Sequence, residues 1–282
     1  MSSLFKVNNT FYGFSQLINL YENNRESWFE TINIDIENFF AANMCSPLAA
    51  ILDKLIDNLN TITLNVRGDV RNILQRNGFL SEYGYENVFD EQETTIPYRK
   101  FAPTESKEFA VYVLKKLLER NDMPHMSDKL KTHTLIAISE IFSNASVHTN
   151  TPYVYACGQF YPKKKLLDFT LSDQGEGIRE KVSDFLAKPL SSEEAIRWAM
   201  VDGNTTKKNI PGGYGLTILR SLIEYNKGFM QIVSDDGFYQ FSHEKEIFKT
   251  FESKFPGTVV NLQFRTDDAS SYYLKSERKE SI

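Results

Sequence analysis

The sequence predicts a two-domain α/β protein, with a small α/β unit at residues 1–100 and an α+β sandwich at residues 101–268. In the first part, short strand patterns alternate with short helix patterns, which favours a parallel sheet with crossover connections. In the second part, amphipathic helices precede a run of strand patterns, which favours helices on one face of a mixed, largely antiparallel sheet. Residues 269–282 are polar and are expected to form a frayed tail.

Length and composition are those of an ordinary globular protein. The chain has 282 residues, of which 41% are hydrophobic and 24% charged. This length is enough for one large domain or two ordinary domains, each able to bury a core. The formal net charge of −5 argues against a protein that binds nucleic acid by phosphate neutralisation alone. Two distant cysteines indicate neither a disulfide framework nor a zinc site. Because we find no signal-peptide pattern and no apolar run of about 20 residues, we expect a cytoplasmic protein without a membrane span.

Five elements are expected in the first hundred residues, in the order helix, strand, helix, strand, helix. The second helix has Pro47 at its first position and Ser46 as its N-cap. The third helix is closed by Asn77 and Gly78, with the glycine in a left-handed conformation. The expected ranges are helix 14–21, strand 31–36, helix 47–59, strand 61–66 and helix 69–76.

Residues 85–103 contain acidic residues and two prolines and are expected to be a linker. An amphipathic helix follows at 105–120, with Thr104 as a candidate cap, and another begins at Asp128. The triplet 235–237, Asp-Asp-Gly, is expected to be a hairpin turn. The remaining expected elements are strands 153–160, 166–171, 229–233, 238–241 and 258–264, and helices 192–200 and 216–225.

The helix that begins at Asp128 carries the first group of candidate functional residues. Its apolar spacing places Glu140 and Asn144 one turn apart on the same face. The Asn144 carbonyl oxygen, with phosphate oxygens and water, would satisfy a Mg²⁺ ion. Glu140 would then lie beside the metal-bound phosphates, where it could orient or deprotonate an attacking water. Taken alone, a Glu and an Asn at this spacing are more often a solvated pair.

An Asp-x-Gly-x-Gly turn after the apolar strand 166–171 is the second group. An ionised Asp173 only accepts hydrogen bonds, which suits an amino group such as the exocyclic amine of adenine. Gly175 and Gly177 would let the backbone turn tightly and approach a flat ring. Together with the helix, this turn predicts a site for a nucleotide and a metal ion.

A glycine-rich loop before the expected helix 216–225 is the third group. The backbone N–H groups of Gly213, Tyr214 and Gly215 would meet phosphate, helped by the positive end of the following helix. Lys207, together with Lys208, would add positive charge in a mobile lid above the phosphates.

The order and spacing of these three groups resemble the motifs of the GHKL ATPase superfamily, which includes gyrase, histidine kinases and MutL. The resemblance covers about residues 104–266, with an N box at 140–144 and glycine boxes at 173–177 and at Gly212 to Leu216. It implies ATP bound in a Bergerat fold, with Mg²⁺ on Asn144 and adenine on Asp173. It also implies a lid over residues 202–213 and a role for Thr258 near the adenine.

The N-terminal unit resembles the STAS-like fold of anti-sigma-factor antagonists and sulfate-transporter tails over about residues 25–90. In that family, a phosphorylatable serine opens a helix within an Asp-Ser-Ser-Gly turn. The matching residues here run from Met44 to Pro47, and only Ser46 agrees with the family. We therefore expect Ser46 to cap the helix rather than to be phosphorylated.

The expected function is that of a regulatory protein that binds ATP and Mg²⁺. Its lid would close on nucleotide and so change its contact with a protein partner, with a second copy or with its own N-terminal unit, and Glu140 would support slow hydrolysis. One alternative is a serine kinase that acts on a STAS-like partner, as anti-sigma factors do. Another is a domain that binds ATP only structurally, as a dimerisation switch. Neither a nucleic-acid partner nor histidine autophosphorylation is indicated.

Overall fold

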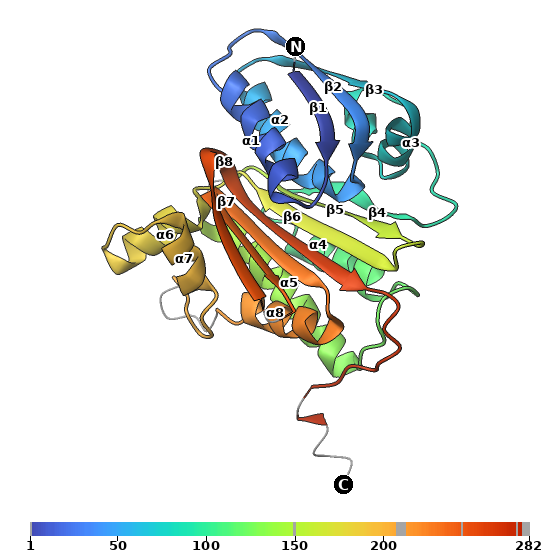
Figure 1. Cartoon of the computed structure of the whole chain (residues 1–282), viewed down its shortest axis with the longest axis vertical. Helices are drawn as coiled ribbons and strands as arrows, with labels where there is room; N and C mark the ends of the chain where they lie inside the picture. The colour runs from blue at the N-terminus through green and yellow to red at the C-terminus, as the bar shows by residue number, and fades with distance from the viewer. Residues whose placement is uncertain (1, 149–150, 207–212, 244, 275, 278–282) are drawn as a thin grey trace.

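The computed structural model describes residues 2–148, 151–206, 213–243, 245–274, 276 and 277 (Figure 1). It contains a parallel sheet of three strands and an antiparallel sheet of five. Figure 1 shows the smaller sheet and its helices stacked against one face of the larger sheet, with further helices on the opposite face. The protein is a mixed α/β protein.

The small sheet is built from two strand–helix–strand units with parallel strands in the order β1-β2-β3. Its elements are β1 (Ser2–Val7), α1 (Phe11–Asn24), β2 (Thr31–Phe40), the 3₁₀ turn η1 (Ala42–Met44), α2 (Cys45–Asp57), β3 (Thr61–Val66), α3 (Gly68–Arg76) and the 3₁₀ turn η2 (Phe79–Tyr83). The predicted crossover architecture is confirmed, and so is the left-handed Gly78, which has φ 84°. Strand β1 was not predicted, because its six residues show no clear alternation.

The large sheet has the strand order β4-β5-β6-β8-β7. Its strands are β4 (Thr95–Phe101), β5 (Val154–Tyr161), β6 (Leu166–Asp173), β7 (Phe229–Ser242) and β8 (Lys245–Arg265). Its helices are α4 (Ser106–Val113), the π-helical turn η3 (Leu114–Leu118), α5 (Asp128–His148), α6 (Gly177–Leu186), α7 (Ser192–Ala199) and α8 (Gly215–Asn226). The expectation of a mixed sheet is wrong, because every neighbouring pair is antiparallel. Strands β6 and β7 run in the same direction, but β8 lies between them.

Both faces of the large sheet are covered. Helices α5 and α8 pack on one face, and α1 and α2 of the N-terminal part pack on the other (Figure 1). Strand β6 alternates to match: its odd-numbered residues 167–171 belong to the core under α5 and α8, while Thr170 and Ser172 face the N-terminal part. The prediction of helices on one face therefore describes only one of the two layers.

Helix α2 lies between the two sheets, and this explains why it is apolar around almost its whole circumference. Ser46 is fully buried there and is not an N-cap, contrary to the prediction. The helix already begins at Cys45, directly after η1, so Ser46 lies in the first turn. Its hydroxyl donates to the backbone oxygen of Tyr155 at 2.9 Å and lies 2.8 Å from Ser172 Oγ on β6.

Thr104 does not cap a helix either. Helix α4 begins at Ser106 after Glu105, and no side chain caps its backbone. The Glu105 carboxylate instead accepts a hydrogen bond from the Ala102 N–H at 2.7 Å, which closes the turn that precedes the helix.

The Asp-Asp-Gly triplet 235–237 is not a hairpin turn, because β7 continues through it to Ser242. It forms an irregularity in the pairing of β7 with β8, where the register shifts on both sides of Asp235 and this residue has φ 53°. The irregularity anchors two helices that follow β6 along the chain. Ser192, the first residue of α7, donates a hydrogen bond to Asp236. Arg179 of α6 pairs with Asp235 at 3.1 Å.

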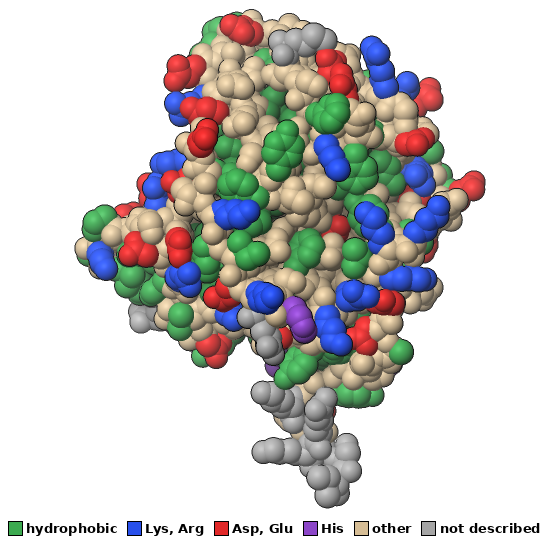
Figure 2. Space-filling view, viewed as in Figure 1, with side chains coloured by type: hydrophobic (Ala, Val, Ile, Leu, Met, Phe, Trp, Pro, Cys, Tyr) green, Lys and Arg blue, Asp and Glu red, His purple; other side chains and the backbone are tan. Residues whose placement is uncertain are grey.

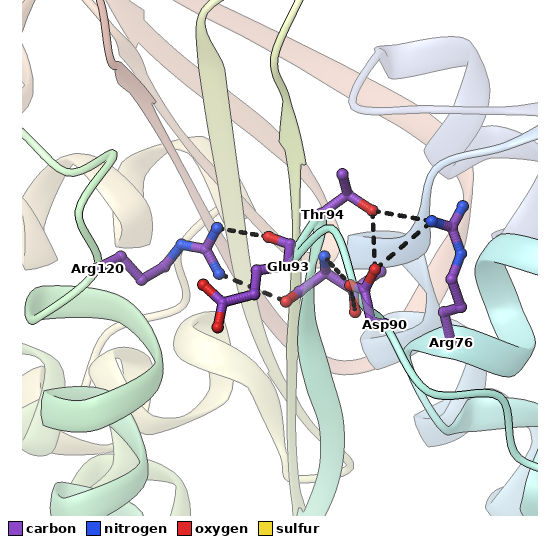
Figure 3. Close-up of polar contacts among 6 residues, drawn as sticks. Arg76, Asp90, Glu93, Thr94 and Arg120 are labelled. Atoms are coloured by element: carbon purple, nitrogen blue, oxygen red, sulfur yellow. Dashed lines mark hydrogen bonds and ion pairs between the residues drawn. The ribbon is translucent and has the colours of Figure 1, made fainter.

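The segment expected to be a linker is tied to both parts of the protein (Figure 3). Asp90 Oδ2 accepts hydrogen bonds from the N–H and the hydroxyl of Thr95, both at 2.7 Å, and Asp90 Oδ1 lies 3.5 Å from Arg76 of α3. On the other side, Arg120 donates to the Glu93 carbonyl at 2.7 Å. Within the expected linker 85–103, residues Thr95–Phe101 form strand β4.

The surface of the face shown in Figure 2 carries both acidic and basic side chains, with hydrophobic side chains between them. In the part of the chain that the structure describes, no helix is both long enough and apolar enough to cross a bilayer.

Candidate functional site

A cavity lies where α5, the end of β6, an inner part of β8, the end of α7 and the N-terminal parts of α6 and α8 meet. Much of its wall is apolar and includes Ile141, Ile178, Val182, Leu216 and Val260. The polar groups that point to it include Glu140, Asn144, Asp173, Lys181 and Thr258. A mostly apolar wall with a few convergent polar groups is typical of sites for small molecules.

The cavity brings together most of the residues that the sequence singled out, although they come from distant segments. Those at its wall are Glu140, Asn144, Asp173, Gly213, Gly215, Leu216 and Thr258. Three more are described but lie outside the wall, namely Gly175, Gly177 and Tyr214. Lys207 and Gly212 lie outside the described residues.

Glu140 and Asn144 lie on α5 as the apolar spacing predicts, with Ala137, Ile138 and Phe142 buried in the core beneath them. This packing turns the opposite side of the helix toward the cavity, where Asn144 is exposed. The amide of Asn144 is therefore accessible to a ligand or a hydrated ion in the cavity.

The Glu140 carboxylate binds the glycine-rich loop. Its Oε1 accepts from the N–H of Gly213 at 2.7 Å, and its Oε2 accepts from the N–H of Gly215 at 2.9 Å. Gly215 is the first residue of α8, so the carboxylate lies at the positive end of that helix, where an anion is stabilised. The Gly213 and Gly215 N–H groups, which the sequence analysis assigned to phosphate, thus donate to the Glu140 carboxylate in this structure.

Both glycines of this loop are required by close approaches. Gly213 has φ 81°, and a Cβ there would lie 2.1 Å from the Asn204 carbonyl oxygen. A Cβ on Gly215 would lie 2.9 Å from the Ala137 carbonyl oxygen and 3.0 Å from Glu140 Oε2. The Gly203 N–H also donates to the Gly213 carbonyl at 3.2 Å, which joins the two ends of the predicted lid.

Asp173 ends β6 and pairs directly with Thr258 on β8. Its Oδ1 accepts from the Gly175 N–H at 2.7 Å. Burial raises the pKa of this carboxyl above its ordinary value, and the Gly175 N–H and the nearby Lys181 ammonium oppose that shift. A carboxylate offers about four lone-pair positions, so its bonds to backbone N–H groups leave acceptor capacity for a ligand amine.

Gly175 and Gly177 are not among the residues that line the cavity, and their approach to a flat ring stays a prediction. Gly177 has φ 83°, and a Cβ on it would lie 2.6 Å from Asp235 Oδ2. The Ile178 N–H donates to Ser234 Oγ at 2.8 Å, so the start of α6 is held against the pairing irregularity of β7. This contact places Ile178 and Val182 on the cavity wall.

Helix α6 supplies residues that the sequence analysis missed. Lys181 lines the cavity, and its Nζ donates to the Asn144 backbone oxygen at 3.1 Å, which puts a positive charge beside Asn144. Trp198, from α7, contributes an aromatic ring to the wall. The spacing of Ile178 and Val182, one turn apart directly after the Asp-x-Gly-x-Gly turn, was the available signal for α6.

The donor and acceptor set fits a nucleotide better than a metal ion alone. Among the described residues, no group of three His, Cys, Asp or Glu side chains could hold a metal. A Mg²⁺ ion that takes one protein oxygen, from Asn144, and completes its shell with phosphate oxygens and water needs no such group. The cavity wall combines a carboxylate acceptor at Asp173, the Lys181 ammonium, the glycine-rich loop and apolar side chains, which together suit the base, phosphates and sugar of a nucleotide.

Comparison of the chain with models of known protein families, and with curated proteins, finds no match. The choice of a function therefore depends on the cavity and on the chemistry of its residues.

Proposed function

We propose that the protein is a regulatory protein that binds ATP and Mg²⁺ in this cavity. The observation that supports the proposal most strongly is the convergence of three separate segments on one cavity. These segments are the α5 face with Glu140 and Asn144, the end of β6 with Asp173, and the glycine-rich loop with Gly213 and Gly215. Any one of these patterns is common, but their meeting at a single cavity is not expected of unrelated turns.

The base would bind at Asp173. The carboxylate would accept the exocyclic amine of adenine, and Ile178 and Val182 would contact the ring from the α6 side. Thr258 is adjacent to Asp173 in the sheet, and its hydroxyl lies 3.1 Å from Ser234 Oγ, so it offers a further polar atom at this end.

The phosphates would bind near the start of α8, where the Gly213 and Gly215 N–H groups now bind Glu140. Asn144 lies one turn beyond Glu140 on α5, and Lys181 contacts its backbone oxygen, so these two residues would bind the metal and the phosphates. The bound Mg²⁺ would neutralise phosphate charge. Displaced from the two amides, the Glu140 carboxylate would be available to orient or deprotonate a water molecule.

The proposal includes the family relationships that the motifs indicate. In this view the C-terminal part is an ATP-binding domain of the GHKL type, and the N-terminal part is a STAS-like unit. Closure of the segment 202–213 over the nucleotide stays a prediction, because residues 207–212 lie outside the described part of the chain. Through that closure, nucleotide would control contact with a protein partner or a second copy.

The alternative of a serine kinase receives no support from Ser46 as an internal substrate. Its hydroxyl is fully buried against Ser172, on the face of β6 opposite the cavity. The alternative of a kinase that acts on a separate STAS-like partner does not depend on Ser46 and stays a prediction. Incubation with γ-labelled ATP separates the readings, because hydrolysis releases free labelled phosphate and a kinase labels protein.

The test of the proposal is calorimetric titration with ATP in the presence and absence of Mg²⁺. We expect the wild-type protein to bind ATP more tightly with Mg²⁺, and Asn144→Ala to lose the Mg²⁺-dependent part of the binding. Asn121→Ala, which is remote from the cavity, is the matched control. If Asn144→Ala responds to Mg²⁺ as the wild type does, the metal assignment is wrong.

A further inference from the structure

The two residues that flank Asp173 are both bound by helix α2 of the N-terminal part. On one side, Ser172 Oγ lies 2.8 Å from Ser46 Oγ. On the other side, Gln174 Nε2 donates to the Ala50 carbonyl oxygen at 2.8 Å. Because Ser46 and Ala50 are four residues apart on α2, they lie on the same face of that helix. This one face therefore contacts the chain immediately before and immediately after Asp173.

Asp173, at the end of β6, is held by its pairing with β5 and β8, and the residues beside it are also held from the side opposite the cavity. Gln174 is 4% exposed, and its backbone N–H donates to Thr151 Oγ1 at 3.1 Å. One turn beyond Ala50 on α2, the ammonium group of Lys54 lies near enough to contribute to lowering the pKa of Asp173, against the larger effect of burial. The position of the Asp173 carboxylate thus depends on a helix from a different part of the chain.

The contribution of the Gln174 side chain to folding stability does not explain why a glutamine occupies this position. Its Oε1 atom is buried and has no hydrogen-bond partner among the described residues. A buried oxygen without a partner costs free energy and offsets the gain from the Nε2 hydrogen bond. An apolar side chain of the same shape would fill this position at little or no cost to folding.

We propose that Gln174 is a positioning residue through which α2 holds the end of β6, with Asp173, in its ligand-binding geometry, so that docking of the N-terminal part and binding of an adenine nucleotide reinforce each other. The inference deepens the proposed function and depends on it, since it takes Asp173 to be the acceptor for the base. The coupling is reciprocal, because two events linked through one equilibrium change each other's free energy by the same amount.

The test compares two glutamine-to-methionine variants at the contact between the N-terminal part and the large sheet. Gln174→Met removes the hydrogen bond to Ala50 together with the unpartnered oxygen. In the control, Gln159→Met, the lost group is an Oε1 atom that accepts from the Ala42 N–H at 2.6 Å and from the Tyr161 hydroxyl at 2.9 Å. Gln159 lies on β5 and does not contact the cavity. Affinities for adenosine and for Mg-ATP are measured by calorimetry, and stability by urea unfolding.

We expect Gln174→Met to weaken the affinities for adenosine and for Mg-ATP equally, by about tenfold. This factor is within the usual range of coupling between sites. Its midpoint of unfolding should stay near that of the wild type. Gln159→Met should show the opposite pattern, a lower midpoint with unchanged affinities, because it leaves buried donors without an acceptor. Adenosine should also slow hydrogen exchange of the α2 amides in the wild type, and less so in Gln174→Met.

Three results would overturn the inference. The first is an unchanged adenosine affinity in Gln174→Met, and the second is a loss that affects Mg-ATP but not adenosine, which would assign the effect to the phosphates. The third is an equal loss of affinity in the two variants, which would indicate a general effect of the contact. If the wild-type protein binds neither ligand, the proposed function fails and this inference fails with it.

Discussion

Among single residues, the carboxylate of Glu140 occupies the position that the proposed function gives to a phosphate group of the nucleotide. Its two oxygens accept from the N–H groups of Gly213 and Gly215 at 2.7 and 2.9 Å. A phosphate oxygen would compete for the same donors, and its negative charge would repel the carboxylate. Binding of a triphosphate therefore requires Glu140 to leave these amides. That movement would also make the carboxylate available to a water molecule.

Replacement of Glu140 by alanine tests this competition. We expect Glu140→Ala to bind Mg-ATP about tenfold more tightly, equivalent to about 1.4 kcal/mol, to bind adenosine as the wild type does, and to lose hydrolysis. Glu180→Ala, at an exposed position on α6, serves as the control. Calorimetry and phosphate release give the two readouts. A weaker affinity for Mg-ATP in Glu140→Ala would mean that the carboxylate supports the glycine-rich loop rather than competing for it.

The role of Asp173 predicts a change in base preference. An asparagine at this position can offer either an oxygen or an N–H₂ group, whereas the carboxylate only accepts. We expect Asp173→Asn to lose affinity for ATP and to gain affinity for ITP, whose base has a carbonyl oxygen in place of the exocyclic amine. The ratio of the two dissociation constants is the measurement, with Asp184→Asn on the exposed side of α6 as the control. A ratio that does not change would remove Asp173 from base recognition.

At the scale of elements, α6 owes its position to Gly177. This residue combines φ 83° with a Cβ position 2.6 Å from Asp235 Oδ2. We expect Gly177→Ala to lower the free energy of unfolding by roughly 1–3 kcal/mol, and to weaken nucleotide binding, since both backbone strain and a clash follow. Gly84→Ala is the control, because Gly84 has φ 81° but no atom within 4 Å of the position of an added Cβ. This variant therefore reports the effect of backbone strain alone. Equal losses in urea unfolding would show that the clash contributes nothing.

Strand β6 also carries a buried titratable group, Asp168. Burial raises the pKa of this carboxyl from 3.8 to about 7, against the effect of Gln263, whose Nε2 donates to it at 2.8 Å. Between these two pH values, the folded protein keeps a proton that the unfolded chain has released, so stability falls as the pH rises. We expect Asp168→Asn to remove this decline from a plot of melting temperature against pH, while Asp184→Asn keeps it. If the melting temperature of Asp168→Asn falls with pH as steeply as that of the wild type, another group causes the pH dependence.

The elements that the sequence predicted well are those with a clear local pattern. Strand β3 was predicted to the residue, and the apolar spacing of α5 located Glu140 and Asn144 correctly. The errors arise where a tertiary contact decides the conformation. Ser46 has the chemistry of a cap but is buried between two sheets, and the triplet 235–237 has the chemistry of a turn but anchors α6 and α7 within β7. Local sequence propensity does not contain information on such tertiary contacts.

At the scale of the whole molecule, the N-terminal part covers the face of the large sheet opposite the cavity. The contact between the N-terminal part and the large sheet combines apolar packing with buried hydrogen bonds, such as that from Asn43 Nδ2 to Thr170 Oγ1 at 2.9 Å. The sequence predicted two units but not the contact between them. The local pattern of α2 shows that the helix is apolar but does not show on which strands it packs. Lys181 was missed for a related reason: it reaches the cavity only through the anchoring of α6 on β7.

In the proposed function, one cavity binds a nucleoside triphosphate and its metal ion. A crystal structure of the protein with Mg²⁺ and a non-hydrolysable ATP analogue tests it most directly. In that structure we expect the adenine amine within hydrogen-bonding distance of Asp173, the metal ion on the Asn144 oxygen, and Glu140 moved away from the N–H groups of Gly213 and Gly215. A nucleotide bound elsewhere, or a cavity that stays empty while Glu140 keeps both amides, would contradict it.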